Sequence, residues 1–100
     1  ITLPAPLVAA AVEECGRKQV YGALVISAGF AEEGPEGAAL EAEVLRVARS
    51  WGIRVIGPNV MGIVNTDPAV RMSATFVRVA PLPGRAAWAR AIASSLVSMP

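Results

Sequence analysis

Three short turn sequences hold the residues of this chain that are best suited to contact a ligand. They are Leu3-Pro4-Ala5-Pro6, Ile26-Ser27-Ala28-Gly29-Phe30 and Gly57-Pro58-Asn59-Val60. Proline and alanine form a flat apolar wall, while backbone N–H groups in such turns can hold phosphate or amide oxygens. Ser27 adds a hydroxyl group, although it can equally bond to its own backbone. Asn59 is either a ligand residue or an ordinary turn residue.

Each of these turns follows a short apolar stretch that reads as a β-strand. The three stretches are residues 1–3, which read as a strand end, residues 21–26 and residues 53–56. In an open α/β sheet, ligands sit in the crevice outside the carboxyl ends of the strands. We therefore expect Ala5, Ser27 and Asn59 to meet at one shared crevice.

Two amphipathic helices connect these strands. The first begins near Pro6, ends near Gly16 and carries an apolar stripe of Leu7, Val8, Ala11, Val12 and Cys15. The second ends at Gly52, with the apolar stripe Leu40, Val44, Val47, Ala48 and Trp51 and the charged residues Glu41, Glu43, Arg46 and Arg49 away from it. Before the second helix, residues 32–37 read as a mobile acidic loop rather than a metal site, since nothing fixes their carboxylates.

This order of elements predicts an α/β fold, a partial Rossmann-like (doubly wound) parallel sheet of the form β-α-β-α-β. A short β-hairpin follows at residues 63–65 and 70–76, where apolar and polar residues alternate from Val70 to Phe76. Three strands with two helices cannot cover both faces of such a sheet. Because the chain also begins with isoleucine inside a strand end, we expect a further β-α unit upstream and interpret the sequence as a fragment.

Composition excludes several classes of function. The net charge of +1 comes from scattered charges and gives no basic stripe for nucleic acid. No apolar run reaches the roughly 18 residues of a membrane span, and no secretory signal is visible. The chain has no histidine, which excludes a Ser-His-Asp triad, a His-containing zinc site and a phosphohistidine within these residues. Its one cysteine, Cys15, is expected to be a small buried apolar residue rather than a reactive thiol.

Taken in order, these motifs resemble the CoA-binding domain of the NDP-forming acyl-CoA synthetases, the family of succinyl-CoA synthetase alpha subunit and ADP-forming acetate–CoA ligase. The resemblance rests on the first turn, on residues 25–32, on residues 52–59 and on the run Gly62-Ile63-Val64-Asn65-Thr66-Asp67-Pro68. It is closest to the form fused to a GNAT-type protein acetyltransferase, because residues 63–71 resemble that branch more than the succinyl enzymes. It implies that CoA or acyl-CoA lies against Pro4, Ala5, Ile26, Ser27, Ala28, Pro58, Asn59 and Val60, with no metal and no catalytic residue in this chain.

The chain departs from the family at three places. Val60 stands where the family usually has a cysteine, the phosphate-binding loop after the first strand is not in these residues, and the resemblance stops near Arg85. We therefore divide the chain into residues 1–84, the C-terminal part of the CoA-binding domain, and a divergent tail at residues 85–100. A frameshift near Arg85 is one hypothesis for that tail.

The resemblance implies a cytoplasmic segment of a larger acyl-CoA synthetase or acetyltransferase, which is not expected to be active alone. ATP or ADP would act only through other domains or subunits, which are its expected partners besides CoA. Without the phosphate-binding loop, we expect the affinity for CoA to fall to millimolar or weaker, which amounts to negligible binding by the isolated fragment. Two alternatives stay open: a free-standing CoA-binding regulatory protein without catalysis, and an unrelated doubly wound domain.

Overall fold

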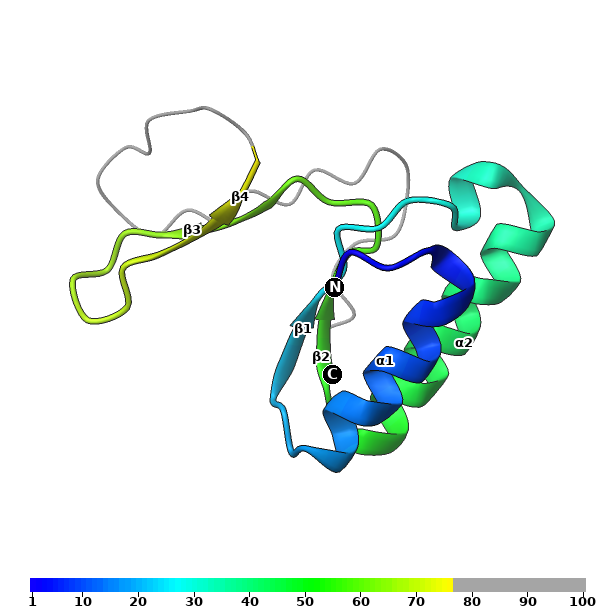
Figure 1. Cartoon of the computed structure of the whole chain (residues 1–100), viewed down its shortest axis with the longest axis horizontal. Helices are drawn as coiled ribbons and strands as arrows, with labels where there is room; N and C mark the ends of the chain where they lie inside the picture. Colours follow the sequence, from blue (N-terminus) through cyan, green and yellow to red (C-terminus); the bar gives the residue numbers. More distant parts are fainter. Residues whose placement is uncertain (77–100) are drawn as a thin grey trace.

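The computed structural model describes residues 1–76, which form two helices beside a parallel pair of strands, followed by an antiparallel hairpin (Figure 1). The predicted linker and tail, including residues 85–100, lie outside the described residues. Within residues 1–76, no helix combines the length and apolar character needed to cross a membrane.

The parallel sheet forms where the sequence predicts its strands, although the regular strands are shorter than expected. Strand β1 (Gly22–Leu24) pairs in parallel with β2 (Arg54–Ile56), with Leu24 opposite Ile56. On the other side of β1, the Ile1 amino group donates to the Leu24 carbonyl oxygen at 2.6 Å, and the Ile26 N–H donates to the Ile1 carbonyl oxygen at 3.0 Å. This is the hydrogen-bond pattern of parallel strands. Ile1 therefore takes the place of the third strand end that the sequence predicted.

Two helices, α1 (Ala5–Arg17) and α2 (Pro35–Trp51), lie side by side on one face of β1 and β2 (Figure 1). A proline near the start of each helix suits a position whose N–H would have no helical partner. Gly52 ends α2 in the left-handed conformation, with φ of 68°. The largest fully buried side chains come from both helices, β1's end and the loop after it: Phe30, Val8, Val12, Val25 and Val44.

The prediction of a mobile acidic loop at residues 32–37 is wrong in part. A short 3-10 turn, η1 (Ala31–Glu33), is followed at once by α2, which starts at Pro35. Gly37 is buried, and a Cβ atom added to it would collide with the carbonyl oxygen of Phe30. The first turn of α2 therefore rests directly on the backbone of the loop after β1, a contact that charge composition alone did not reveal.

The buried faces of the helices differ from the predicted stripes at three residues. Glu41, predicted on the solvent side of α2, is only 7% exposed, and its carboxylate accepts a hydrogen bond from the loop after β1. Leu7 and Trp51, predicted on the apolar stripes, are 53% and 44% exposed. Trp51 lies at the end of α2 against Gly16, and its Nε1 donates to Glu13 Oε2 at 2.8 Å. Cys15 is partly buried against the core, in line with its expected apolar role.

The predicted hairpin is confirmed. Strands β3 (Gly62–Asn65) and β4 (Met72–Thr75) pair antiparallel, with Asn65 opposite Met72. In the connection, the Asn65 side-chain oxygen accepts a hydrogen bond from the Asp67 N–H at 3.0 Å, as is usual for asparagine in turns. The hairpin extends away from the helices (Figure 1).

Candidate functional site

The three predicted turns lie together at the carboxyl ends of the parallel strands. The Asn59 N–H donates to the Ser27 carbonyl oxygen at 2.9 Å, which joins the turn after β2 to the turn after β1. A Cβ atom added to Gly29 would lie 3.2 Å from the Cβ of Ala5, so the start of α1 lies beside the same turn. Figure 1 shows the N-terminus at the tips of β1 and β2. The arrangement is the crevice geometry expected for a ligand site in this class of fold.

The eight predicted site residues divide by exposure into two groups. Five of them present side-chain surface, either fully or partly: Pro4, Ile26, Ser27, Ala28 and Asn59. The other three are buried: Ala5, Pro58 and Val60. Buried side chains cannot contact a ligand in this conformation, so the second group fixes the shape of the turns.

Glycine allows the turn after β2 to approach β1 closely. Gly57 has φ of 105°, a conformation that glycine adopts without strain. A Cβ atom at this position would collide with the carbonyl oxygen of Val25, directly after β1. The following Gly57–Pro58 peptide is cis. Glycine is therefore required here for the two strand tips to meet.

The two polar side chains of the site make few hydrogen bonds within residues 1–76. The Ser27 hydroxyl lies 3.5 Å from the Ile1 carbonyl oxygen, at the outer limit of a hydrogen bond, so it remains available to a better acceptor. Asn59 has φ of 55°, which asparagine tolerates better than most residues. Its backbone N–H is used by Ser27, and within residues 1–76 we find no hydrogen bond made by its side-chain amide.

Two carboxylates that the sequence analysis did not single out hold the loop after β1. Glu32 Oε1 accepts the Gly29 N–H at 2.6 Å, and Glu41 Oε2 accepts the Ala31 N–H at 3.2 Å. Partial burial acts to raise the pKa of the Glu32 carboxyl, but the backbone N–H groups of Glu32, Gly29 and Phe30 together lower it below its ordinary value. The three-residue spacing from Gly29 to Glu32 is the signal that could have revealed the first contact, because acids at this spacing often reach back to a free N–H.

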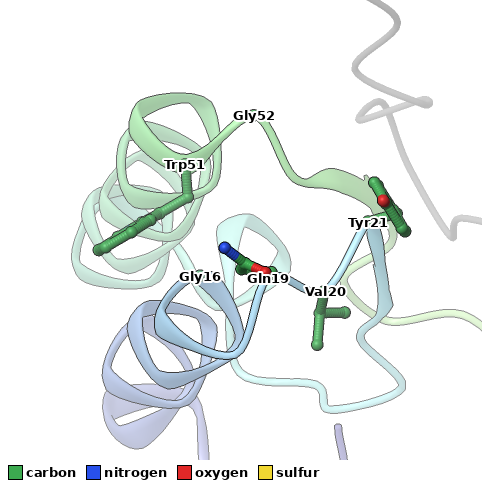
Figure 2. A pocket seen from close by; sticks show the side chains of 6 residues that line it. All are labelled: Gly16, Gln19, Val20, Tyr21, Trp51 and Gly52. Atoms are coloured by element: carbon green, nitrogen blue, oxygen red, sulfur yellow. The ribbon is translucent and has the colours of Figure 1, made fainter.

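A separate open hollow of about 510 Å³ lies at the other end of the molecule, lined by Gly16, Gln19, Val20, Tyr21, Trp51 and Gly52. Figure 2 shows Trp51 and Tyr21 on opposite sides of it. This end holds the C-termini of α1 and α2, whose carbonyl groups disfavour anions. The hollow is therefore a poor place for a phosphate-bearing ligand, and the strand tips remain the candidate site. Within residues 1–76, no three potential metal-ligand side chains come together.

Comparison with known proteins connects this geometry to one group of enzymes. No protein-family model matches the chain. It is 57% identical over 88 residues to "Acetate--CoA ligase [ADP-forming] I" of Archaeoglobus fulgidus, a match that covers 88% of this chain and 13% of the relative. It is 39% identical over 87 residues to "4-hydroxybutyrate--CoA ligase [ADP-forming]" of Nitrosopumilus maritimus, covering 87% of this chain and 12% of the relative.

Solved structures agree with the sequence comparison. The crystal structure of a Pyrococcus horikoshii OT3 protein superimposes with a TM-score of 0.71 and 43% identity, covering 79% of this chain and 18% of that one. The chain thus spans only a small part of the proteins that it matches. The identity and the shared fold together show that the chain is homologous to one segment of the ADP-forming acetate–CoA ligases, the segment that sequence analysis equates with their CoA-binding domain.

Proposed function

We propose that this chain is the CoA-binding segment of an ADP-forming acyl-CoA synthetase, with CoA or acyl-CoA lying across the tips of β1 and β2. The observation that carries the proposal is the meeting of the three turns, through the hydrogen bond from Asn59 to Ser27 and the close approach of Gly29 to Ala5. Residues far apart in the sequence thereby share one edge of the sheet, which is where this class of fold binds ligands.

The exposed groups of this edge suit the chemistry of a pantetheine chain. Pro4 and Ala28 offer apolar surface to its methylene groups, while Ser27 and Asn59 offer polar groups to its amides. Ala5, Pro58 and Val60 are buried and offer no side-chain surface to a ligand. Val60 has no sulfur, so no side chain at that position can react with the CoA thiol.

The chemistry of acyl transfer must come from outside these 100 residues. They contain no histidine that could carry a phosphoryl group, and the relatives that they match are ligases many times longer. In this proposal ADP or ATP binds to other parts of the protein, and the present segment supplies only the CoA end of the reaction. The boundary near residue 84 belongs to the proposal.

The relatives reported above are named as CoA ligases, so the ligase branch is the one we propose. The form fused to an acetyltransferase, suggested by residues 63–71, is supported by the sequence resemblance alone. A free-standing CoA-binding regulatory protein would use the same edge of the sheet and differ only in lacking ligase domains.

The test is an NMR titration of the 15N-labelled 100-residue chain with CoA, since this method detects the weak, millimolar binding expected here. We expect shift changes concentrated at the amides of Ser27, Gly29 and Asn59. Changes centred instead on Gly16 and Gly52 would place the ligand in the opposite hollow and contradict the proposal.

A matched pair of variants sharpens this test. Asn59→Gly and Gln19→Gly each remove an amide side chain from a residue with positive φ, at 55° and 60° respectively. Glycine accepts both conformations without strain. Gln19 lines the opposite hollow. Only the Asn59 variant is expected to weaken CoA binding, by about fivefold if its amide makes one neutral hydrogen bond of about 1 kcal/mol.

A further inference from the structure

We propose that the open hollow at the C-terminal ends of α1 and α2 docks an acidic protein segment, which inserts one large apolar side chain. This inference goes beyond the proposed function, because it concerns the end of the molecule opposite the candidate CoA site. It rests on the exposed aromatic residues that line the hollow and on the distribution of charge around it.

Three large apolar side chains are exposed around this one hollow. Trp51 and Tyr21, on opposite sides of it, are 44% and 90% exposed, and Val20 beside Tyr21 is 39% exposed (Figure 2). Single exposed apolar residues are common, but a group of them at a concave site marks an interaction surface. Tryptophan and tyrosine are also the residues that most often dominate the binding energy of protein interfaces.

The walls of the hollow are ordered before any partner binds. The ring of Trp51 lies against Gly16, where an added Cβ atom would collide with it, and its Nε1 donates to Glu13 Oε2 at 2.8 Å. On the other side, the Tyr21 carbonyl oxygen accepts the Arg54 N–H at 3.1 Å. A partner therefore loses little affinity to the ordering of this surface.

Cationic side chains are concentrated around the hollow. Residues 13–21 and 49–54, which include every lining residue, contain four of the six cationic side chains found in residues 1–76. These four are Arg17, Lys18, Arg49 and Arg54, and all are exposed. The same two segments contain two carboxylates, whereas the other described residues contain six carboxylates and two cations. Charge complementarity therefore favours an acidic partner at this end of the molecule.

Helix capping accounts for part of this charge but not for all of it. Arg17 and Arg49 lie in the last turns of α1 and α2, where a cation stabilises the helix dipole. Arg54 lies in β2 instead, opposite Gly22 and next in register to Tyr21. Its charge has no helix end to stabilise, so it is available to a carboxylate of a partner.

The shape of the hollow separates the apolar contact from the charged ones. The carbonyl groups at the helix ends disfavour an anion inside it, so an uncharged side chain enters while the carboxylates of the partner stay at the rim. A volume of about 510 Å³ admits a phenyl side chain. An apolar centre with a charged rim is the usual anatomy of a protein interface. We favour a protein over a membrane surface, because a flat surface would leave a hollow unfilled.

The experiment is an NMR titration of the 15N-labelled chain with an acetylated and amidated pentapeptide, in which a phenylalanine is flanked by two glutamates on each side. We expect shift changes at the Trp51 indole N–H and at the amides of Gly16, Tyr21 and Gly52. Exchange of the phenylalanine for alanine, or of the glutamates for lysines, should weaken binding by about fivefold or more. Raising the ionic strength from about 0.01 M to about 1 M should also weaken it, because the screening length falls from about 30 Å to about 3 Å.

Two matched pairs of variants test the ring and the charge separately. Tyr21→Ala and Phe76→Ala each remove an exposed ring, at residues 90% and 63% exposed, but only Tyr21 lines the hollow. Arg54→Gln and Arg71→Gln each remove an exposed cation that makes no ion pair within residues 1–76. We expect Tyr21→Ala to weaken peptide binding by about fivefold and Arg54→Gln by about twofold, with no change in the two controls.

Each contrary outcome overturns a stated part of the inference. No shift change at the hollow, or peptide binding unaffected by Tyr21→Ala, would refute the docking site. Equally tight binding of the lysine peptide would refute the preference for an acidic partner. Loss of the Trp51 and Gly52 signals on addition of phosphatidylglycerol vesicles, with no response to the peptide, would assign this end to a membrane surface instead. None of these results bears on CoA binding, which is read from the amides of Ser27, Gly29 and Asn59, so the two proposals fail separately.

Discussion

Replacement of Gly37 by alanine tests the contact that sets the candidate site most directly. In a helix this change alone stabilises a protein by about 0.5–1 kcal/mol, because alanine has the higher helix propensity. In this structure the new Cβ atom would collide with the carbonyl oxygen of Phe30. Overpacking of this kind costs about 1–3 kcal/mol, and a backbone atom yields less readily than a side chain, so we take the upper end. The expected result is a net loss of about 2 kcal/mol in the free energy of unfolding, from the difference of these two effects.

Thermal and urea unfolding followed by circular dichroism would measure this loss. For a domain of this size, a loss of about 2 kcal/mol lowers Tm by roughly 8–16 °C. Gly16→Ala is the matched control, since Gly16 also lies in a helix and its new Cβ would meet the side chain of Trp51. Trp51 is 44% exposed, and its ring can turn outward only by giving up its hydrogen bond to Glu13, so a loss of about 1 kcal/mol, smaller than that of Gly37→Ala, is expected. If Gly37→Ala were as stable as the wild type, α2 could not rest on the Phe30 carbonyl, and our account of how the loop is positioned would be wrong.

Three further predictions concern the core and the loop. Val8→Ala should lower the free energy of unfolding in urea by about 2–3 kcal/mol, because Val8 is fully buried. Leu7→Ala should lower it by less than about 1 kcal/mol, because Leu7 is 53% exposed. Equal losses would contradict the assigned faces of α1. Glu41→Ala should cost about 1–3 kcal/mol by leaving the Ala31 N–H without its partner, and Glu41→Gln should recover part of that loss; no loss in either variant would show that the contact is not formed. The lowered pKa of Glu32 predicts a stabilisation that is complete above the ordinary pKa of 4.5 and is lost as pH falls through the lower folded pKa. Glu32→Gln should lack this part of the pH dependence of unfolding. Identical pH profiles of wild type and variant would contradict the assigned contact of Glu32.

Much of the fold could be predicted from periodicity and from turn-forming residues. Apolar residues at helical spacing located both helices, and Gly52 marked the end of α2 because only glycine enters the left-handed conformation there without strain. The alternation from Val70 to Phe76 located the hairpin, since side chains of a strand point in turn to its two faces. Helix spacing, helix ends and strand alternation depend on neighbouring residues, so the local sequence was sufficient to predict them.

The composition of the candidate site was also visible in the sequence, because parallel strands bring their following turns to one edge. Which of those residues face outward was not visible. Ala5, Pro58 and Val60 are buried, although nothing in their residue types separates them from the exposed Pro4 and Ala28.

The tertiary structure alone decided the contacts between segments distant in the sequence. The acidic stretch at residues 32–37 was predicted to be a solvated loop. Instead, Glu32 of that stretch accepts a hydrogen bond from the Gly29 N–H, and Glu41 of α2 accepts one from the Ala31 N–H, so both carboxylates contact the loop after β1. A carboxylate is equally suited to water or to a backbone N–H, and only the approach of α2 to the strand tip determines which it meets. The sequence by itself determined the helices, the strands and the edge where the turns gather. Packing determined which groups at that edge are free to bind, because burial and hydrogen-bond partners depend on what the fold brings alongside each residue.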